Sequence, residues 1–275
     1  MRTILDGPMG TELAARGVPT PAPLWSAWAL DHAPEVIAQI HRDYAAAGAT
    51  VHTATTFRTK RRQAGDRWEA LARRAVAIAR AAVPAGHRVA GSVAPLEDCY
   101  RPDLSPAEDI GALQAARAEH EELARVLVDA GADLLICETF PHVGEALAAV
   151  EACVSTGVET WAAFTAGPGA PLLSVEAMEA GAREAVRRGA AAVMVNCTAA
   201  TRTLAYVERL VRIGVPVGAY ANAGDAEEEI GWDEAPPEGA ARYAQLAAEW
   251  ARAGATILGG CCGTGPAHIR AIAAL

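Results

Sequence analysis

Three cysteines near the ends of two apolar runs are the residues best suited to chemistry in this sequence. Cys261 and Cys262 lie in the glycine-rich segment 259–265, which follows the apolar run 255–258. Cys197 ends another apolar run, 191–196. Three thiols placed in this way predict a metal site with three sulfur ligands, and zinc with three protein ligands keeps its fourth position open for catalysis. For Cys261 and Cys262, a vicinal disulfide or a tight turn of small residues is the alternative.

The other cysteines and two of the histidines have settings that point to packing. Cys99, Cys137 and Cys153 follow no such pattern, and free cysteine is among the most buried residue types. His41 and His120 lie within helical patterns and are expected to be packing or surface residues. None of these five residues is expected to bind a metal ion.

Seven glycines recur at the end of a helical pattern, shortly before a short apolar run. Glycine just past a helix takes the left-handed cap conformation at little steric cost. The runs that follow these glycines, together with one run at the N-terminus, predict eight strands. The glycines are Gly48, Gly86, Gly131, Gly157, Gly189, Gly214 and Gly254, and the strands are 3–5, 51–53, 88–93, 134–137, 160–164, 193–195, 215–220 and 256–258.

Helical periodicity fills the segments between these strands, and Ile37, Ile40 and Tyr44, for example, fall on one face. The segment 105–108 has the spacing of a capping box with proline at the first helical position, and it is predicted to open a helix. Eight apolar strands that alternate with helices indicate parallel strands buried on both faces. We therefore predict an α/β fold, a single (β/α)8 TIM barrel that occupies residues 1–275 as one domain. An open doubly wound sheet is the alternative.

Such a barrel carries its catalytic groups at the C-terminal ends of the strands. Glu138 follows a strand directly, and its carboxylate is expected to face the substrate and to contact a substrate amino group. The alternative is that this carboxylate only bonds to groups of a neighbouring strand. Asp6 is expected in the active site, with a cap of the first helix or turn as the alternative. Tyr220 and Asn222 are expected either to take part in the site or only to form a polar turn, and the sequence favours neither. The polar and thiol residues at strand ends are Asp6, Thr53–Thr56, Ser92, Glu138, Asn196, Cys197, Tyr220, Asn222, Cys261 and Cys262.

Composition limits the classes of partner. The chain has 275 residues and a formal net charge of −9, which argues against nucleic acid and acidic membranes as partners. The sequence predicts no membrane span and no signal peptide. Six cysteines without a secretory signal indicate reduced thiols in a cytoplasm. The basic run 58–62 is expected to be a solvated loop, or else to attract an anionic substrate group.

Taken together, these residues resemble the homocysteine S-methyltransferase family over nearly the whole chain. That family includes S-methylmethionine- and betaine-dependent enzymes and the homocysteine module of cobalamin-dependent methionine synthase. The motif around Cys261 and Cys262, together with the one around Cys197, is highly specific. The segments that carry the resemblance are 6–11, 24–27, 41–44, 47–49, 53–57, 137–141, 195–198, 220–224 and 259–264.

The resemblance implies a (β/α)8 barrel with catalytic acidic residues and a zinc ion bound by three thiolates. Some residues depart from the family pattern on the substrate rim, namely Ala54, Ala223 and the segment 94–96. The implied zinc ligands are Cys197, Cys261 and Cys262, and the implied catalytic residues are Glu138 and Asp6. The implied substrate-binding residues are Gly7, Met9, Thr11, Thr55, Asn196, Tyr220 and Asn222.

The implied reaction is methyl transfer to the thiol of L-homocysteine, giving methionine. Zinc coordination would deprotonate that thiol, and its sulfur would attack a methyl group on a positively charged donor. The short segment after residue 265 leaves no room for folate or cobalamin modules, so a small sulfonium such as S-methylmethionine or S-adenosylmethionine is expected. Trp25, Trp28, Phe57 or Tyr220 would supply cation–π contacts to that donor.

Several alternatives stay open. Within the same family they are a betaine-like donor, or another thiol or selenol acceptor. Outside it they are a barrel enzyme whose segment 259–265 cradles a phosphate, and a zinc-binding or thiol-sensing barrel without turnover. The expected partners are small-molecule substrates only, and the expected assembly is a monomer or a small homo-oligomer.

Overall fold

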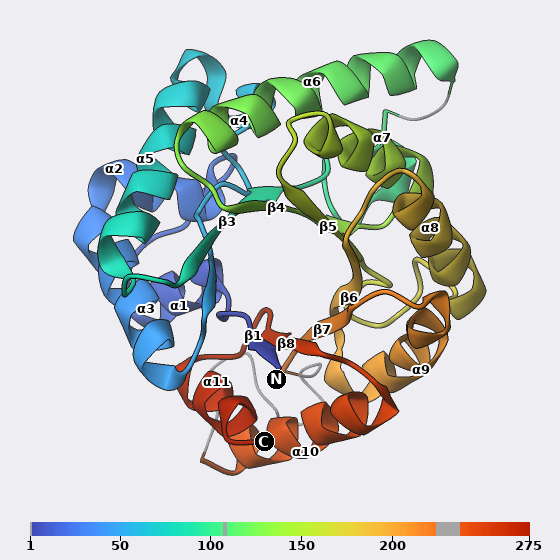
Figure 1. The fold of residues 1–275 in the computed structure, drawn as a ribbon. Helices are drawn as coiled ribbons and strands as arrows, with labels where there is room; N and C mark the ends of the chain where they lie inside the picture. The colour runs from blue at the N-terminus through green and yellow to red at the C-terminus, as the bar shows by residue number, and fades with distance from the viewer. Residues whose placement is uncertain (1, 107–108, 224–236) are drawn as a thin grey trace.

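Eight parallel strands form a closed ring in the computed structural model, which describes residues 2–106, 109–223 and 237–275. The hydrogen-bonded order is β1-β8-β7-β6-β5-β4-β3-β2. A parallel bridge between Leu5 and Val51 joins the two ends of this order and closes the ring (Figure 1). The predicted (β/α)8 barrel is therefore confirmed. The strands are β1 (Thr3–Ile4), β2 (Val51–Thr53), β3 (Arg88–Val93), β4 (Leu134–Phe140), β5 (Glu159–Phe164), β6 (Ala192–Ala199), β7 (Val217–Asn222) and β8 (Ile257–Gly260).

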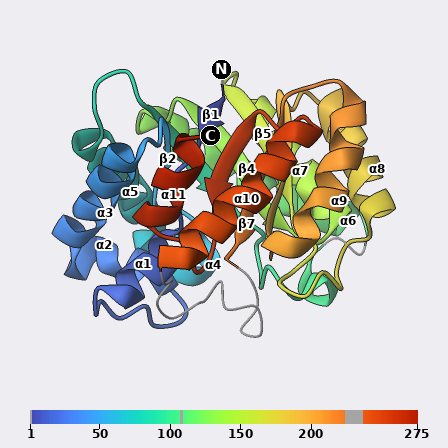
Figure 2. The same ribbon diagram turned by 90° about the horizontal axis from the view of Figure 1, so that it is seen from below.

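Helices surround the ring, and the two chain ends lie at the same end of the barrel (Figure 2). The main helices are α3 (Pro34–Ala47), α5 (Trp68–Ala82), α6 (Ile110–Asp129), α7 (Val143–Val154), α8 (Val175–Arg187), α9 (Ala200–Leu210), α10 (Pro237–Ala253) and α11 (Pro266–Ala273). Short helices and turns are α1 (Met9–Ala15), α2 (Ala29–His32), α4 (Arg61–Ala64), η1 (Trp25–Trp28), η2 (Gly65–Arg67), η3 (Pro102–Leu104) and η4 (Val211–Ile213). No helix in the described ranges is both long and apolar enough to cross a membrane.

Two apolar clusters stabilise this arrangement. The larger cluster lies between helices and strands and includes the predicted face of α3, where Ile37, Ile40 and Tyr44 are fully buried. The smaller cluster includes Leu134 and Met194 among its strand residues, as in the layered interior of such barrels. Burial on both faces explains why the strands are nearly continuous apolar runs.

Each of the seven predicted glycines has a positive φ angle. Gly48, for example, caps α3 with φ 109° and leads directly to β2. A Cβ atom at this position would also lie 2.7 Å from the Cβ of Ala273 on α11. Glycine at the end of α3 is therefore required both by the backbone conformation and by the close approach of α11.

The predicted start of a helix at residues 105–108 is wrong. Helix α6 begins at Ile110, and the side chain of Asp109 caps it by accepting a hydrogen bond from the amide of Ala112. The Ser105 hydroxyl donates instead to the buried carboxylate of Glu145, at 2.5 Å. Ala107 and Glu108 of the predicted box, and Gly224 of another motif, lie outside the described residues.

The hydroxyl of Tyr243, on α10, bonds to backbone groups of both β7 and β8, the strands next to Cys261 and Cys262. Its buried hydroxyl accepts from the amide of Ala221 at 3.1 Å and lies 3.0 and 2.9 Å from the carbonyl oxygens of Ala221 and Gly259. We expect Tyr243→Phe to lower the free energy of unfolding by about 1–3 kcal/mol, because buried partners lose their bonds. Urea denaturation measures this change.

Tyr206→Phe is the matched control, because within the described ranges the Tyr206 hydroxyl makes one hydrogen bond, to the carbonyl of Leu173 at 2.9 Å. Its expected loss is smaller, about 1 kcal/mol. Equal losses in the two variants would contradict the assigned role of Tyr243.

Candidate metal centre and substrate cavity

The three predicted cysteines meet at the C-terminal rim of the barrel. The sulfur atoms of Cys197, Cys261 and Cys262 all lie within 4.8 Å of one another. Cys197 comes from β6, and the other two follow β8 directly. The barrel thus brings together thiols from segments that are far apart in the sequence.

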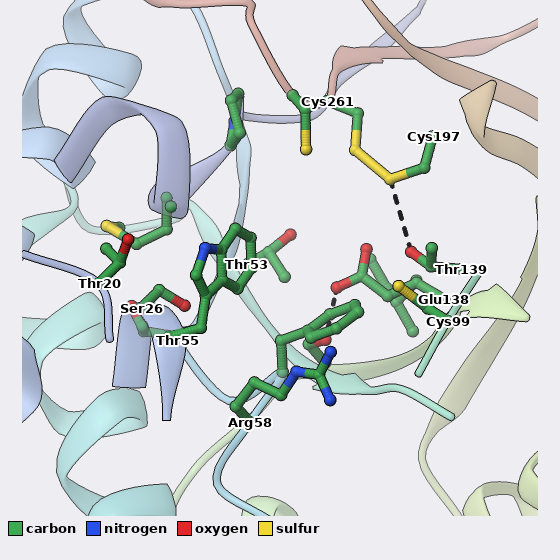
Figure 3. A pocket seen from close by; sticks show the side chains of 18 of the residues that line it. Thr20, Ser26, Thr53, Thr55, Arg58, Cys99, Glu138, Thr139, Cys197 and Cys261 are labelled. Atoms are coloured by element: carbon green, nitrogen blue, oxygen red, sulfur yellow. Dashed lines mark hydrogen bonds between the residues drawn. A yellow bond between two sulfur atoms is a disulfide. The ribbon is translucent and has the colours of Figure 1, made fainter. Parts of the chain in front are cut away.

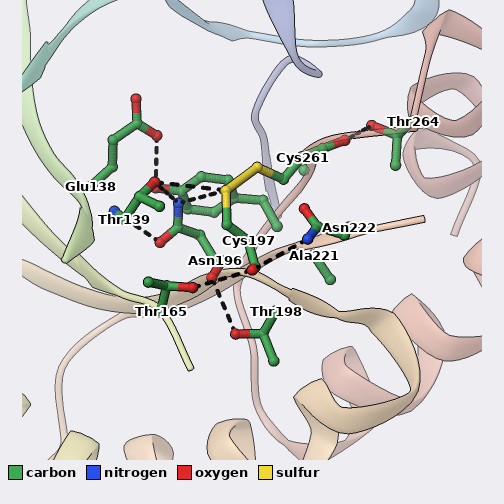
Figure 4. The surroundings of a disulfide bond; sticks show 12 residues. Glu138, Thr139, Thr165, Asn196, Cys197, Thr198, Ala221, Asn222, Cys261 and Thr264 are labelled. Carbon is green, nitrogen blue, oxygen red and sulfur yellow. Dashed lines mark hydrogen bonds between the residues drawn. A yellow bond between two sulfur atoms is a disulfide. The ribbon is translucent and has the colours of Figure 1, made fainter. Parts of the chain in front are cut away.

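Two of these sulfur atoms are joined in the structure, which differs from the expected set of three free thiols. Cys197 and Cys261 form a disulfide (Figures 3 and 4). Cys262 is a free cysteine. The alternative of a vicinal disulfide between Cys261 and Cys262 is therefore wrong. The Cα atoms of Cys197 and Cys261 are 5.6 Å apart, a usual separation for a disulfide, so the same proximity that suits a metal also permits oxidation.

The donor set suits a thiophilic metal ion. Zinc–sulfur bonds of about 2.3 Å in a tetrahedral site hold their sulfurs roughly 3.8 Å apart. After reduction, sulfurs that already lie within 4.8 Å of one another need only small movements to reach that spacing. Burial raises the pKa of the Cys262 thiol to about 12, so a nearby cation is needed to hold it as a thiolate at neutral pH.

An unusual backbone turn aims Cys197 at the rim. Its φ is 47°, and that of Thr139 on β4 is 63°, and such angles are costly for residues other than glycine. The buried carboxamide of Asn196 accepts from the amide of Thr139 at 3.1 Å and donates to its hydroxyl at 2.7 Å. Asn222 and Thr165 donate to the carbonyl of Cys197 at 3.2 and 3.1 Å. These bonds fix both turns (Figure 4).

A cavity of about 980 Å³ opens beside the cysteines (Figure 3). This volume is at the upper end of the range for small-molecule sites, and it is ample for two small substrates. Among the predicted site residues, Asp6, Gly7, Met9, Thr55, Glu138, Tyr220, Cys197, Cys261 and Cys262 line it.

The remaining predicted substrate-binding residues stand behind the cavity wall. Asn196 and Asn222 hold the turn at Cys197, as described above. The hydroxyl of Thr11 accepts from the amide of Gly263 at 3.3 Å and so holds the cysteine-containing loop. These three residues support the site, and they do not line the cavity.

Two carboxylates face the cavity from different strands. Glu138 accepts hydrogen bonds from the hydroxyls of Ser92 and Tyr220, the latter at 3.2 Å. Asp6 accepts from the amide of Thr53 at 2.8 Å. Burial raises the pKa of Glu138, and it raises the pKa of Asp6 well above its ordinary value, with a further contribution from the negative charge of Glu138. A cationic ligand between the two would stabilise both carboxylates in the ionised form.

A cluster of buried histidines lies behind Asp6. His41 Nδ1 is 4.0 Å from the Asp6 carboxylate, and His52 Nε2 is 3.0 Å from His87 Nδ1. Burial lowers the pKa of His41 to about 3 and that of His52 to about 4, so both rings are neutral at pH 7. Sequence reasoning had placed His41 and His120 in packing or surface positions, and both are fully buried. It gave no signal for His52, because only the fold brings β2 against α3.

Residues outside the predicted set also line the cavity. Cys99 was expected only to pack; it is buried and lies in the cavity wall (Figure 3). Tyr100 and Arg58 line it as well. Trp25, one of the aromatic residues expected to contact a cationic donor, lines the cavity with its ring 5.9 Å from that of Phe57. The loops that contribute Cys99 and Tyr100 show no periodicity, so the sequence gave no signal that these two residues line the cavity.

Cys137, Cys153 and Trp28 lie away from the cavity. Cys137 and Cys153 pack against each other, with sulfurs 3.5 Å apart. Trp28 stacks on His32, with ring centroids 3.9 Å apart. The contact between the two cysteines agrees with their expected packing role. Trp28 does not line the cavity, so it is not placed to make the expected cation–π contact to a donor.

Known proteins show the same combination of fold and sequence. Residues 3–275 match the family model described as homocysteine S-methyltransferase. The homocysteine S-methyltransferase of Escherichia coli (strain K12) is 34% identical over 98% of this chain and 94% of its own length. Crystal structures of the homocysteine methyltransferase MmuM from Escherichia coli superpose with TM-scores of 0.82 for the metallated form and 0.80 for the oxidized form. Both are 30% identical to this chain, cover 99% of it, and are themselves covered to 96% and 95%. This chain belongs to the homocysteine S-methyltransferase family and is a methyltransferase.

Proposed function

We propose that this protein transfers a methyl group from a small sulfonium donor to the thiol of L-homocysteine, using zinc held by Cys197, Cys261 and Cys262. S-methylmethionine and S-adenosylmethionine are the proposed donors. The observation that carries the proposal is the meeting of three cysteine sulfurs within 4.8 Å of one another at the wall of a large cavity. Membership of the family supports homocysteine as the acceptor.

The residues of this chain suit the binding of homocysteine. Glu138 would accept hydrogen bonds from the substrate ammonium, since its carboxylate lies in the cavity wall and is oriented by Ser92 and Tyr220. Asp6 would add a second negative charge on the same side. The hydroxyl of Thr55 is buried, has no hydrogen-bond partner among the described residues and belongs to a cavity-lining residue, so it is available to the substrate carboxylate.

Bound zinc would supply a cation that keeps the thiol of homocysteine ionised near neutral pH. The thiol proton would leave to solvent. The sulfur lone pair would then form a bond to the donor methyl carbon, while the bond from that carbon to the donor sulfonium breaks and its electron pair returns to the donor sulfur. Holding both substrates in line would contribute much of the acceleration. Trp25 and Phe57, in edge contact at the cavity wall, would favour a cationic donor.

The disulfide between Cys197 and Cys261 belongs to an oxidised protein that lacks the three thiolates. Metal binding therefore requires its reduction. A reducing compartment such as the cytoplasm would keep these thiols available.

The first test is methyl transfer to L-homocysteine by reduced, zinc-loaded protein, followed as methionine by mass spectrometry. S-methylmethionine, S-adenosylmethionine and betaine are offered separately. We expect turnover with a sulfonium donor. Turnover with betaine alone would replace the proposed donor class, and the absence of turnover with any donor, from protein that contains zinc, would refute the proposed reaction.

The proposed ligand set predicts that Cys262→Ala loses zinc and activity but keeps its fold, because this residue lies on the rim of the barrel. Metal analysis of the reduced protein should fall from about one zinc per chain to a small fraction. Circular dichroism should be unchanged. Cys153→Ala is the matched control, since Cys153 packs against Cys137 away from the cavity, and it should keep its zinc. Retention of zinc by Cys262→Ala, or its global unfolding, would contradict the assignment.

Replacement of Glu138 by glutamine should weaken homocysteine binding by about 10- to 100-fold, because a hydrogen bond to a charged group is lost. The same change should alter how stability depends on pH. The pKa of Glu138 is raised in the folded protein, so its contribution to the free energy of unfolding is complete below its ordinary pKa of 4.5 and is lost as the pH rises through the raised value.

Glutamine does not titrate, so Glu138→Gln should gain stability relative to the wild type as the pH rises from acid to neutral. Urea denaturation at several pH values measures the difference. Glu119→Gln is the control, since that residue is ion-paired with Arg62 at the surface. A stability difference between Glu138→Gln and the wild type that stays constant with pH would show that the carboxyl is not destabilised by burial.

A further inference from the structure

We propose that Arg58 forms a subsite for the carboxylate of the methyl donor. The ligand class is therefore a sulfonium compound that carries a carboxylate, as S-methylmethionine and S-adenosylmethionine do. This inference rests on the proposed function and adds to it a residue that lies outside the predicted set of substrate-binding positions.

Arg58 is a half-buried cation in the cavity wall. Within the described residues, the guanidinium of Arg58 forms no ion pair. Its neighbours in the basic run differ, since Arg61 pairs with Glu122 at 2.5 Å and Arg62 pairs with Glu97 and Glu119. The expectation of a solvated loop therefore fits Arg61, whereas Arg58 keeps its hydrogen-bond donors available within the cavity.

Neighbouring groups hold Arg58 in place. Its guanidinium carbon lies 5.5 Å from the centroid of the Phe57 ring, and that ring is in edge contact with Trp25. The buried ammonium of Lys60 donates to the carbonyl of Phe57 at 2.8 Å, and the Thr59 hydroxyl donates to the carbonyl of Thr56 at 3.0 Å. A cation whose position is already fixed loses little freedom when it binds an anion. A guanidinium also binds a carboxylate through two parallel hydrogen bonds.

The position of Arg58 favours the donor over the acceptor. Homocysteine must place its sulfur at the cysteines, and Glu138 would hold its ammonium. Figure 3 shows Arg58 on the side of the cavity away from Cys197 and Cys261. A carboxylate at Arg58 thus belongs to the second substrate, whose sulfonium would lie between Arg58 and the metal ligands, near the aromatic rings. Three carbons separate the sulfonium from the carboxyl carbon in both proposed donors, so one flexible chain links the two sites.

Calorimetric titration with the donor alone tests this subsite, because no methyl transfer takes place without homocysteine. The probes are S-methyl-L-methionine and its methyl ester, and the proteins are the wild type, Arg58→Gln, Arg58→Lys and Arg61→Gln. We expect Arg58→Gln to weaken binding of S-methyl-L-methionine by about 10- to 100-fold, as for the loss of a charged hydrogen bond. Its affinity for the ester should equal that of the wild type.

Arg58→Lys should lie between the wild type and Arg58→Gln, since it keeps the charge but loses the paired geometry. Arg61→Gln is the matched control from the same loop, and it should bind as the wild type does. The same titrations with S-adenosylmethionine and betaine extend the test to other carboxylate-bearing donors.

Three outcomes would overturn the subsite. The first is equal affinity of Arg58→Gln and the wild type for S-methyl-L-methionine. The second is an effect of Arg58→Gln on the binding of homocysteine but not of the donor. The third is that the wild type binds the methyl ester as tightly as S-methyl-L-methionine itself. Failure of the proposed function would look different: the wild type would bind the donor through Arg58 and yet transfer no methyl group to homocysteine.

Discussion

The closure of the strand ring determines where the functional groups of this protein lie. Because β1 pairs with β8 and its continuation bridges to β2, the carboxyl ends of all eight strands meet on one rim. Cys197 and Cys261 are 64 residues apart in sequence, yet their Cα atoms lie 5.6 Å apart. Asp6 and Glu138 reach the same cavity from β1 and β4. The spacing of these groups depends on the pairing of the strands between them, since each group belongs to or follows a different strand.

Within the closed ring, the site depends on strained backbone held by buried polar groups. Left-handed residues such as Cys197 and Thr139 cost about 1–3 kcal/mol each. The two hydrogen bonds between Asn196 and Thr139 and the bond from Asn222 to Cys197 offset that cost. The two asparagines therefore orient a sulfur that we assign to the metal, although they do not reach the cavity.

Local signals explain what the sequence predicted well. Glycine caps and apolar runs are properties of adjacent residues, so the strands, their parallel arrangement and the meeting of the three cysteines could be foreseen. The predicted capping box at Ser105 is wrong because the Ser105 hydroxyl bonds to the carboxylate of Glu145, which belongs to α7, the helix after α6. Cys99 was not placed in the cavity because its loop folds against groups that only the barrel brings near. For the basic run that contains Arg58, the sequence left a solvated loop and the attraction of an anionic substrate group as alternatives. The disulfide between Cys197 and Cys261 was also missed, since spacing alone does not distinguish thiols that bind metal from thiols that bond to each other.

Most of the residues that depart from the family pattern, namely Ala54, Ala223 and the segment 94–96, do not line the cavity. They therefore have less direct influence on substrate specificity than their places in the motifs suggest. Ala223 is fully buried, and its amide donates to the carbonyl of Cys262 at 3.0 Å, a bond that any residue except proline can make. Leu96 is buried too, and its amide donates to Glu145 at 2.7 Å. Only Ala54 lies in the cavity wall, beside Thr55. Under the proposed function, the choice of donor would then depend mainly on the loops that carry Arg58 and Tyr100. These loops lie outside the strands, so they can change the shape and charge of the cavity without disturbing the cysteines.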